Sequence, residues 1–208
     1  EIDGKKGHLN PLDASVVEEI FARPDFELIY ELRHGVAVLD PRGIFRDVWR
    51  RASLPMGDAV LRAGVFHHYV EMRGLHRNAD NPMDRGDRWA VLTGVVEAAN
   101  HALRCAYLLD ERPYPYIKWL HLAARFSPTA AAVAGEVDAV LALIGSDPDA
   151  LRVPEAESAS SQCLRRIRRI LIHAARAAGI DEPWLNEWWR SIEAARAALD
   201  GVAWPEVD

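Results

Sequence analysis

Residues 84–109, which read DRGDRWAVLTGVVEAANHALRCAYLL, decide the fold. Apolar residues recur in this stretch at intervals of three and four, at Trp89, Leu92, Val96, Ala99, Leu103 and Ala106. This spacing places apolar side chains along one face of an α-helix. The stretch therefore predicts a long helix with one face turned toward a hydrophobic core.

The segments around this helix have the same period. We expect further helices over residues 13–23, 41–52, 57–75, 116–126, 127–144, 161–178 and 183–199. Proline or glycine stands near most of their ends, including Pro24 after the first helix and Gly179 as a C′ residue. The predicted fold class is mainly α, with a bundle of about six helices.

One segment has the pattern of β-strands. The runs Glu27–Leu32 and Val36–Asp40 are separated by Arg33-His34-Gly35, and a three-residue connection with glycine is typical of a hairpin. An isolated hairpin is only marginally stable in water, so we expect it to lean on helices or to belong to a larger sheet. We divide the chain into residues 1–52 with this hairpin, a helical domain at 53–200 and a tail at 201–208.

The composition limits the class of protein. The chain has 208 residues, a net charge of −6 and 50% hydrophobic residues, which suits a globular domain with its own core. It has two cysteines, Cys105 and Cys163, and no run of about 18 apolar residues, so we expect a cytoplasmic protein without a membrane partner. The acidic balance disfavours nucleic acid as a partner. The first residue is Glu1 rather than Met, and we expect the sequence to be part of a longer polypeptide.

Histidines suggest one candidate metal site. His67 and His68 lie in a predicted helix with Glu71 one turn after His67 and His76 two turns on, so a metal-dependent hydrolase is conceivable. No complete metal signature is present, and a His–Glu surface pair explains the same residues. The histidines at positions 101, 121 and 173 are each alone on their predicted helices. Our preferred interpretation assigns no metal ligand to this chain.

Two further clusters have both a functional and a structural interpretation. The arginines of residues 165–169 share a helix face that is able to meet phosphates, although a solvated or ion-paired face is the favoured interpretation. The tryptophans Trp184, Trp188 and Trp189 either close the end of the bundle or form an interface. A non-catalytic interaction or dimerisation module is therefore our alternative function, with a homodimer as its simplest form.

The segment RPYPYIKWL, residues 112–120, is the most distinctive. Its two Pro-Tyr pairs favour extended backbone before a helix, so Tyr114, Tyr116 and Lys118 are expected to project from a stiff corner, suited to an anion or a flat group. Asp87 and Arg88 stand at the start of the long helix, where an acid also complements the helix dipole.

These stretches resemble the C-terminal helical domain of nucleotidyltransferase-superfamily proteins, in particular the kanamycin and lincosamide nucleotidyltransferase-like group. GVAVLDPRGIFRDV, residues 35–48, is similar to the last strand and exit helix of the catalytic domain in that group. The resemblance covers about residues 25–200, and it implies that the predicted hairpin completes a nucleotidyltransferase-type sheet.

The resemblance implies transfer of a nucleoside monophosphate from a nucleoside triphosphate, with Mg²⁺, to a small hydroxylated acceptor. The implied binding residues are Asp87, Arg88, Asn100, Tyr114, Tyr116 and Lys118, and the implied catalytic residue is Glu97. The family's Gly-Ser followed by two metal-binding aspartates is not found here, since the one Gly-Ser is Gly145-Ser146, in a late turn. We therefore expect this chain to be the binding half, with catalysis dependent on a part upstream.

Overall fold

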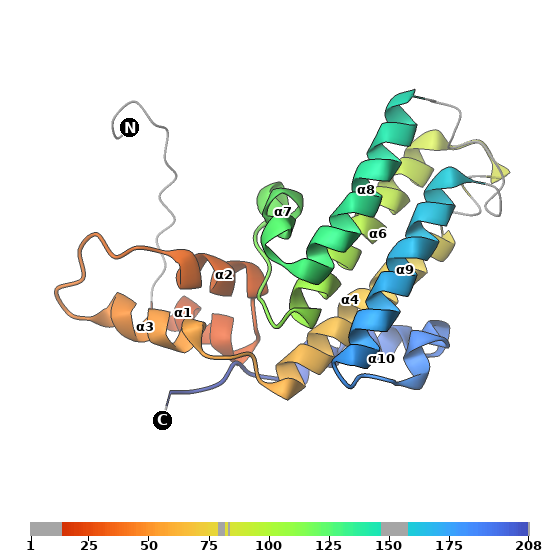
Figure 1. Cartoon of the computed structure of the whole chain (residues 1–208). Coiled ribbons are helices and arrows are strands. Elements are labelled where there is room, and N and C mark those ends of the chain that lie inside the picture. The colour runs from red at the N-terminus through yellow and green to blue at the C-terminus, as the bar shows by residue number, and fades with distance from the viewer. Residues whose placement is uncertain (1–13, 79–81, 83, 147–157, 208) are drawn as a thin grey trace.

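The computed structural model describes residues 14–78, 82, 84–146 and 158–207, and all regular structure within these ranges is helical (Figure 1). Four long helices form the centre of the molecule: α4 (Asp58–Asn78), α6 (Arg88–Leu109), α8 (Pro128–Ser146) and α9 (Ala159–Ala177). The prediction of a mainly α fold built on a helical bundle is confirmed.

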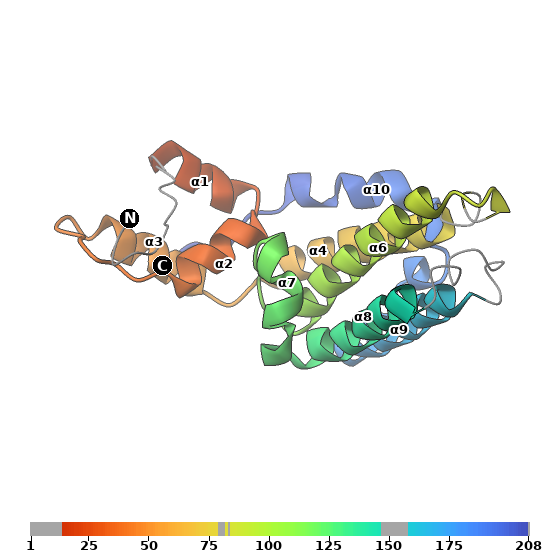
Figure 2. The same cartoon turned by 90° about the horizontal axis from the view of Figure 1, so that it is seen from above.

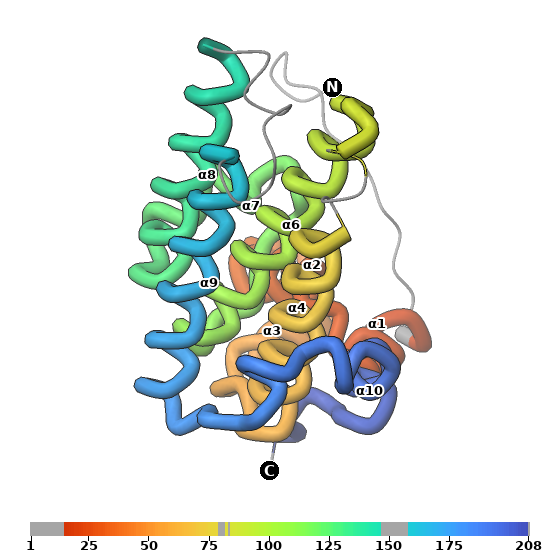
Figure 3. Tube along the Cα trace, turned by 90° about the vertical axis from the view of Figure 1, so that its right-hand side faces the viewer, coloured from red at the N-terminus to blue at the C-terminus, as the bar shows by residue number. Residues whose placement is uncertain are grey.

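The bundle is arranged in layers. α4 packs along α6, and α6 in turn packs on both α8 and α9, which lie beside each other. Figures 2 and 3 show α8 and α9 on one side of this central pair and α10 (Ile192–Arg196) on the other. The short α7 (Ile117–Ala123) and the 3₁₀ helix η1 (Ala124–Phe126) connect α6 to α8 at one end of the bundle.

The buried face of α6 differs from the predicted stripe. Val91, Val95, Ala98, Ala102 and Cys105 are all buried, together with the predicted Ala99, Leu103 and Ala106. Trp89, however, is 77% exposed and Val96 is 45% exposed. Because α6 contacts three long helices, its buried surface is wider than one stripe and is centred on small residues that permit close approach.

The predicted β-hairpin is wrong. Residues Phe26–His34 form helix α2, and its start is fixed by Asp25, whose carboxylate accepts a hydrogen bond from the Leu28 amide at 3.0 Å. The helix buries Phe26 and Ile29, which are three residues apart. A strand, as predicted, would instead bury every second residue. The second predicted strand is the connection to α3 (Ile44–Ser53), and Val38 within it is 97% exposed.

The N-terminal helices are tied to the end of the chain. α1 (Ala14–Ala22) and α2 pack beside α3, and Trp204 lies fully buried against this group. The Trp204 amide donates to the Phe21 carbonyl at 2.7 Å, and its indole N–H donates to the Arg51 carbonyl at 2.9 Å. The predicted tail is therefore anchored through Trp204, and one continuous core includes residues on both sides of the expected boundary at 52.

The last predicted helix, 183–199, is broken into shorter pieces. These are η2 (Pro183–Leu185), η3 (Trp188–Arg190), α10 and η4 (Ala198–Gly201). Two carbonyls of this segment accept side-chain hydrogen bonds from α4: the Tyr69 hydroxyl donates to Leu185 at 2.6 Å, and a His67 nitrogen donates to Ala195 at 3.0 Å. These tertiary bonds fix the segment on α4, and the packing on α4 overrides the helical period.

Helix α8 is apolar along its length. By length and composition it is able to cross a membrane, with a mean hydropathy of 1.5, but the core helix of a bundle often passes the same test. Here it buries Ala130, Val133, Ala134 and Val140 and packs on α6 and α9. A candidate of this kind is weak evidence for membrane insertion.

Candidate anion-binding pocket

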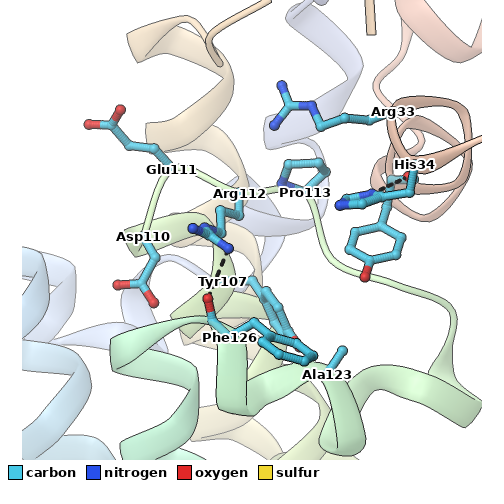
Figure 4. A pocket seen from close by; sticks show the side chains of 10 residues that line it. Arg33, His34, Tyr107, Asp110, Glu111, Arg112, Pro113, Ala123 and Phe126 are labelled. Atoms are coloured by element: carbon cyan, nitrogen blue, oxygen red, sulfur yellow. Dashed lines mark hydrogen bonds between the residues drawn. The ribbon is translucent and has the colours of Figure 1, made fainter. Parts of the chain in front are cut away.

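A cavity of about 610 Å³ opens where α2 faces the end of α6. Figure 4 shows Arg33 and His34 reaching into it from α2, and Arg112 and Phe126 reaching in from the opposite wall. The lining residues are Tyr30, Arg33, His34, Tyr107, Asp110, Glu111, Arg112, Pro113, Ala123 and Phe126. Cationic and aromatic side chains thus share one concave surface, which is the usual form of a small-molecule site.

A helix-ending turn builds one wall of the pocket. The amide of Arg112 donates to the Tyr107 carbonyl at 3.0 Å, and the amide of Glu111 donates to the Leu108 carbonyl at 2.8 Å. This is the Schellman arrangement, which requires a left-handed residue at C′. Glu111 occupies that position with φ of 56°, where glycine is the usual residue. The turn stores backbone strain at the edge of the pocket.

Asp110 holds the same wall to the start of α8. Its carboxylate accepts hydrogen bonds from the Ser127 hydroxyl, from the Thr129 amide at 2.9 Å and from the Thr129 hydroxyl at 2.6 Å. A carboxylate at a helix N-terminus also interacts favourably with the helix dipole. Both oxygens of Asp110 are therefore occupied, and the side chain acts in structure rather than as a ligand to a bound molecule.

Two arginines give the pocket its charge. Arg33 donates to the Ala52 carbonyl at 3.0 Å and to the Leu54 carbonyl at 2.7 Å, while Arg112 donates to the Phe126 carbonyl at 2.9 Å. These acceptors are neutral, and within the described residues neither arginine forms an ion pair with a carboxylate. Burial, and next the charge of Arg112, lower the pKa of Arg33. Arg33 nevertheless stays cationic at neutral pH, because the ordinary pKa of an arginine lies far above 7. Neither arginine is paired with the two acids of the lining, Asp110 and Glu111, so the charge of the arginines is available to a bound anion.

Aromatic rings flank the two cations. The rings of Tyr30 and His34 lie 4.2 Å apart between centroids at an angle of 30°, and the Nδ1 of His34 donates to the Tyr30 carbonyl at 2.8 Å. Phe126 on the other wall is 64% exposed. Exposed rings of this kind offer a flat apolar surface on which a planar group is able to stack. The pocket can therefore hold an anion and a flat ring together.

The predicted corner residues surround this pocket without lining it. Tyr114 is 7% exposed and its hydroxyl lies 2.9 Å from Nε2 of His68, so it points into the bundle and not toward solvent. Tyr116 and Lys118 are exposed at the start of α7, and the Lys118 ammonium lies 5.5 Å from the centroid of the Tyr116 ring. Neither residue is part of the cavity wall.

The other predicted binding residues lie far from this corner. Asp87 caps α6, accepting a hydrogen bond from the Ala90 amide at 3.1 Å, and Arg88 begins the same helix. A helix rises about 1.5 Å per residue, so these two residues lie about 30 Å from the corner that follows its other end. Glu97 is exposed on the middle of α6, and Asn100 borders an apolar groove of about 190 Å³ between α6, α8 and α9. The structure does not bring the predicted set together.

The arginine and tryptophan clusters mostly make contacts within the molecule. Arg166 pairs with Glu136 at 2.8 Å, and Arg168 donates to Asn186 at 3.4 Å. Trp188 is 8% exposed, while Trp189 is 56% exposed. Trp184 packs on Phe66 with ring centroids 5.1 Å apart. Trp184 and Trp188 therefore pack inside the molecule, as the structural interpretation expected, but along the side of α4 and not at the end of the bundle.

The histidines are arranged differently from the predicted metal set. His67, His68 and His101 gather between α4 and α6, with one ligand nitrogen from each within 4.8 Å of the others. Glu71 instead pairs with Arg196 at 2.9 Å, and His76 is hydrogen-bonded to the Ser161 hydroxyl at 3.0 Å. His101, which the sequence presents as solitary, therefore belongs to a cluster.

Sequence reasoning missed the two arginines of the pocket. Arg112 stands in the quoted Pro-Tyr segment, but it draws less attention there than the tyrosines beside it. Arg33 falls in the turn of the wrongly predicted hairpin, and that prediction gives no reason to place Arg33 near Arg112. A helical assignment of residues 26–34 places Arg33 and His34 in the last turn of a helix, and that signal was available.

The carboxylates of the pocket do not fit a magnesium pair. The two acids in its lining are Asp110, whose oxygens are both hydrogen-bonded to α8, and the exposed Glu111. A magnesium-dependent transfer needs carboxylate oxygens free to bind the ion. The two aspartates that follow Gly145-Ser146 in the sequence, Asp147 and Asp149, lie outside the described residues.

Comparison of this chain with protein-family models, with curated proteins and with solved structures gives no significant match. The likeness to nucleotidyltransferase-superfamily proteins rests on the quoted residues alone.

Proposed function

We propose that this helical unit binds a small phosphorylated molecule, with its phosphates on Arg33 and Arg112 and its planar part against the aromatic walls. The observation that carries the proposal is a pair of cations on the surface of one cavity that have no carboxylate partner in the part of the chain that the structure describes. Arginine is well suited to phosphate because its planar donors match two oxygens at once.

A nucleoside triphosphate is the molecule of this class that we favour. It combines several negative charges with a flat base, and the cavity offers about 610 Å³ with rings on both sides. The same molecule is what the nucleotidyltransferase resemblance implies. In this proposal the described chain supplies binding, and the transfer to a hydroxylated acceptor needs carboxylates from elsewhere in the polypeptide.

Calorimetric titration with ATP, without added metal, tests this function. Wild-type protein should bind one equivalent, and Arg112→Ala should bind at least about tenfold more weakly, because a hydrogen bond to a charged group is worth about 1.5–3 kcal/mol. Arg112 is exposed, and among the described residues its side chain donates only to the Phe126 carbonyl, so its removal should leave the fold intact. Inorganic pyrophosphate should bind more weakly than ATP, since it lacks the base.

Two control variants sharpen this experiment. Arg190→Ala removes an exposed arginine that pairs with Glu187 at 3.1 Å on the far side of α4, and it should bind ATP like wild type. Lys118→Ala distinguishes the arginine pocket from the binding site predicted at the Pro-Tyr segment. Loss of ATP binding by this variant would favour the Pro-Tyr segment over the pocket. Equal affinity of Arg112→Ala and wild type for ATP would rule out the pocket.

The alternative function, a dimerisation module, has one structural observation in its favour. The surface around α7 exposes Ile117, Trp119, Leu122 and Phe126, with Trp119 at 57% and Leu122 at 52%. Clustered exposed apolar side chains are typical of protein interfaces. If this surface joins two copies, Trp119→Asp should convert a dimer to a monomer in light scattering. Trp89→Asp, at an exposed tryptophan on α6, is the matched control.

A further inference from the structure

Three imidazoles from two neighbouring helices meet at the centre of the α4–α6 contact. His67 and His68 are adjacent on α4, and His101 lies opposite them on α6. The ring centroids of His67 and His68 are 4.8 Å apart, and those of His68 and His101 are 5.2 Å apart. One nitrogen from each ring falls within 4.8 Å of the other two. Three imidazole nitrogens so close together are the donor set of a transition-metal site.

The hydrogen bond of His67 fixes which nitrogen is available. Its Nδ1 donates to the Ala195 carbonyl at 3.0 Å, so the ring carries its proton on Nδ1 and Nε2 retains a lone pair. In metal sites the second ring nitrogen usually donates to a carbonyl or carboxylate in this way, which orients the ligand. The carbonyl comes from α10, which packs on α4. The bond between these helices thus positions a metal ligand.

The facing rings of His68 and His101 supply two more donors. Their Nδ1 atoms lie 3.0 Å apart and share one proton between them. On its other side His68 places Nε2 at 2.9 Å from the Tyr114 hydroxyl, which is able to accept the ring's proton. A tautomer with both protons on Nε2 frees the two Nδ1 lone pairs, so that an ion is able to take the place of the shared proton. Ligand nitrogens around a tetrahedral ion lie about 3.4 Å apart, given bonds of about 2.0–2.1 Å.

The site is reachable, and charges of both signs lie near it. His68 is 3% exposed, but His67 and His101 are only half-buried, so one side of the cluster is open to an ion. Arg104, the nearby cation, is paired with Glu27 at 2.9 Å. The negative charge of Glu71 acts on His101, which offsets part of the charge of an incoming cation.

We propose that Nε2 of His67, Nδ1 of His68 and Nδ1 of His101 bind one divalent transition-metal ion, with Zn²⁺ as the preferred ion. Imidazole donors suit zinc, copper and nickel, whereas magnesium and calcium require oxygen. Three protein ligands leave a fourth position for water. Tyr114 then acts through His68, Glu71 acts only by its charge, and neither touches the ion. The site is separate from the arginine pocket and does not depend on its function.

Titration of the chelator-treated protein with Co²⁺ tests the proposal, because a four-coordinate cobalt ion gives intense visible absorption bands. Wild-type protein should take up one equivalent with these bands, and Zn²⁺ should then displace the cobalt. His67→Ala and His101→Asn should each lower the affinity by about 100-fold or more, since even partners outside the ligand set are worth about 10–100-fold. Tyr114→Phe should lower it by about 10–100-fold, as a partner that only orients His68.

The control is His173→Ala, which removes an exposed histidine on α9 and should bind cobalt like wild type. Thermal unfolding with and without Zn²⁺ is a second measurement, which also shows whether each variant is folded. The ion should raise the unfolding temperature of wild type and of His173→Ala, but not that of folded His67→Ala. Absence of stoichiometric uptake by wild type, or equal affinity in wild type and His67→Ala, would overturn the site. In that event the three histidines are a hydrogen-bonded part of the core.

Discussion

The Nε2 of His68 and the hydroxyl of Tyr114 lie 2.9 Å apart, and both side chains are buried. This contact joins the middle of α4 to the Pro-Tyr corner that follows α6. The ring of Tyr114 also packs on Phe26 of α2, with centroids 5.2 Å apart, and Arg104 lies 5.4 Å from its centre. One side chain thus connects the helical bundle to the N-terminal helices.

Tyr114→Phe should destabilise the metal-free protein by about 1–3 kcal/mol. The change leaves the ring in place but removes the partner of a buried imidazole nitrogen, and an unsatisfied buried polar group costs about that much. Urea unfolding of both proteins measures the difference. Tyr116→Phe is the control, because Tyr116 is exposed and should change the free energy of unfolding by less than about 0.5 kcal/mol.

The stability of the metal-free protein should fall as the pH drops from about 6.5 to about 4. Burial, and next Arg104, lower the pKa of His101 from 6.5 to about 4, and burial with the neighbouring His101 lowers that of His68. As the pH falls, the unfolded state therefore binds the proton before the folded state does. Protonation begins to favour the unfolded state near pH 6.5, and the effect is complete near pH 4. For His101 the loss should be about 3 kcal/mol.

Chelator-treated protein unfolded in urea at several pH values measures this loss. His101→Asn should show a smaller pH dependence than wild type over the same range, which separates the histidine from carboxylates that titrate below pH 5. Parallel pH curves for the two proteins would contradict the assignment.

Asp110→Ala should cost about 2–4 kcal/mol of stability. The substitution removes three hydrogen bonds to the start of α8, of which two come from Thr129, and it removes a charge from a helix N-terminus. Asp87→Ala, in which a single hydrogen bond to the Ala90 amide is lost, should cost about 1 kcal/mol. A similar cost for both would argue against the network at Asp110.

Glu111→Gly should stabilise the protein by up to about 1 kcal/mol. Glu111 is held at φ of 56° by the turn after α6, and a side chain in this conformation costs about 1–2 kcal/mol. Glycine removes this cost, but its greater flexibility in the unfolded chain offsets part of the gain. The mirror experiment is Gly179→Ala, at φ of 73° after α9, which should destabilise by a similar amount. Chemical unfolding of both variants checks the pair.

Gly64→Ala should destabilise the protein by about 1–3 kcal/mol, although alanine favours helix by about 1 kcal/mol. A Cβ at this position would lie 2.6 Å from Leu108 Cδ1 and 3.1 Å from Phe26 Cζ, and both neighbours are fully buried. Gly74→Ala in the same helix meets only Trp188, at 3.6 Å, and should be neutral or stabilising. Thermal unfolding of the two variants separates packing from helix propensity.

Much of the helical fold is predictable from local patterns. The long helices follow from apolar spacing, and Gly179 adopts the left-handed conformation expected after α9. The error at residues 27–40 has a local cause, because a short apolar run fits the period of a strand as well as that of a helix. The signal that decides for a helix is Asp25, which is its N-cap. The broken segment after Pro183 was not predictable, because hydrogen bonds from Tyr69 and His67, more than 100 residues earlier, decide it.

The candidate sites were harder to predict than the helices. Arg33 and Arg112 are 79 positions apart and meet only because α2 packs beside the end of α6. His67 and His68 attract attention as a pair, but His101 joins them through the crossing of two helices. Spacing along one helix suggested Glu71 as a ligand, whereas the structure directs its carboxylate to Arg196. Sites assembled from distant segments leave little trace in a single sequence.

The buried position of Trp204 has a consequence for synthesis of the chain. Its indole fills the space between Phe26 and Arg33, and its hydrogen bonds join Phe21 and Arg51. A domain made from its N-terminus folds progressively as it leaves the ribosome. Here the first helices emerge early but acquire their final packing only after residue 204 has left the ribosome, so until then they lack the contacts that Trp204 supplies.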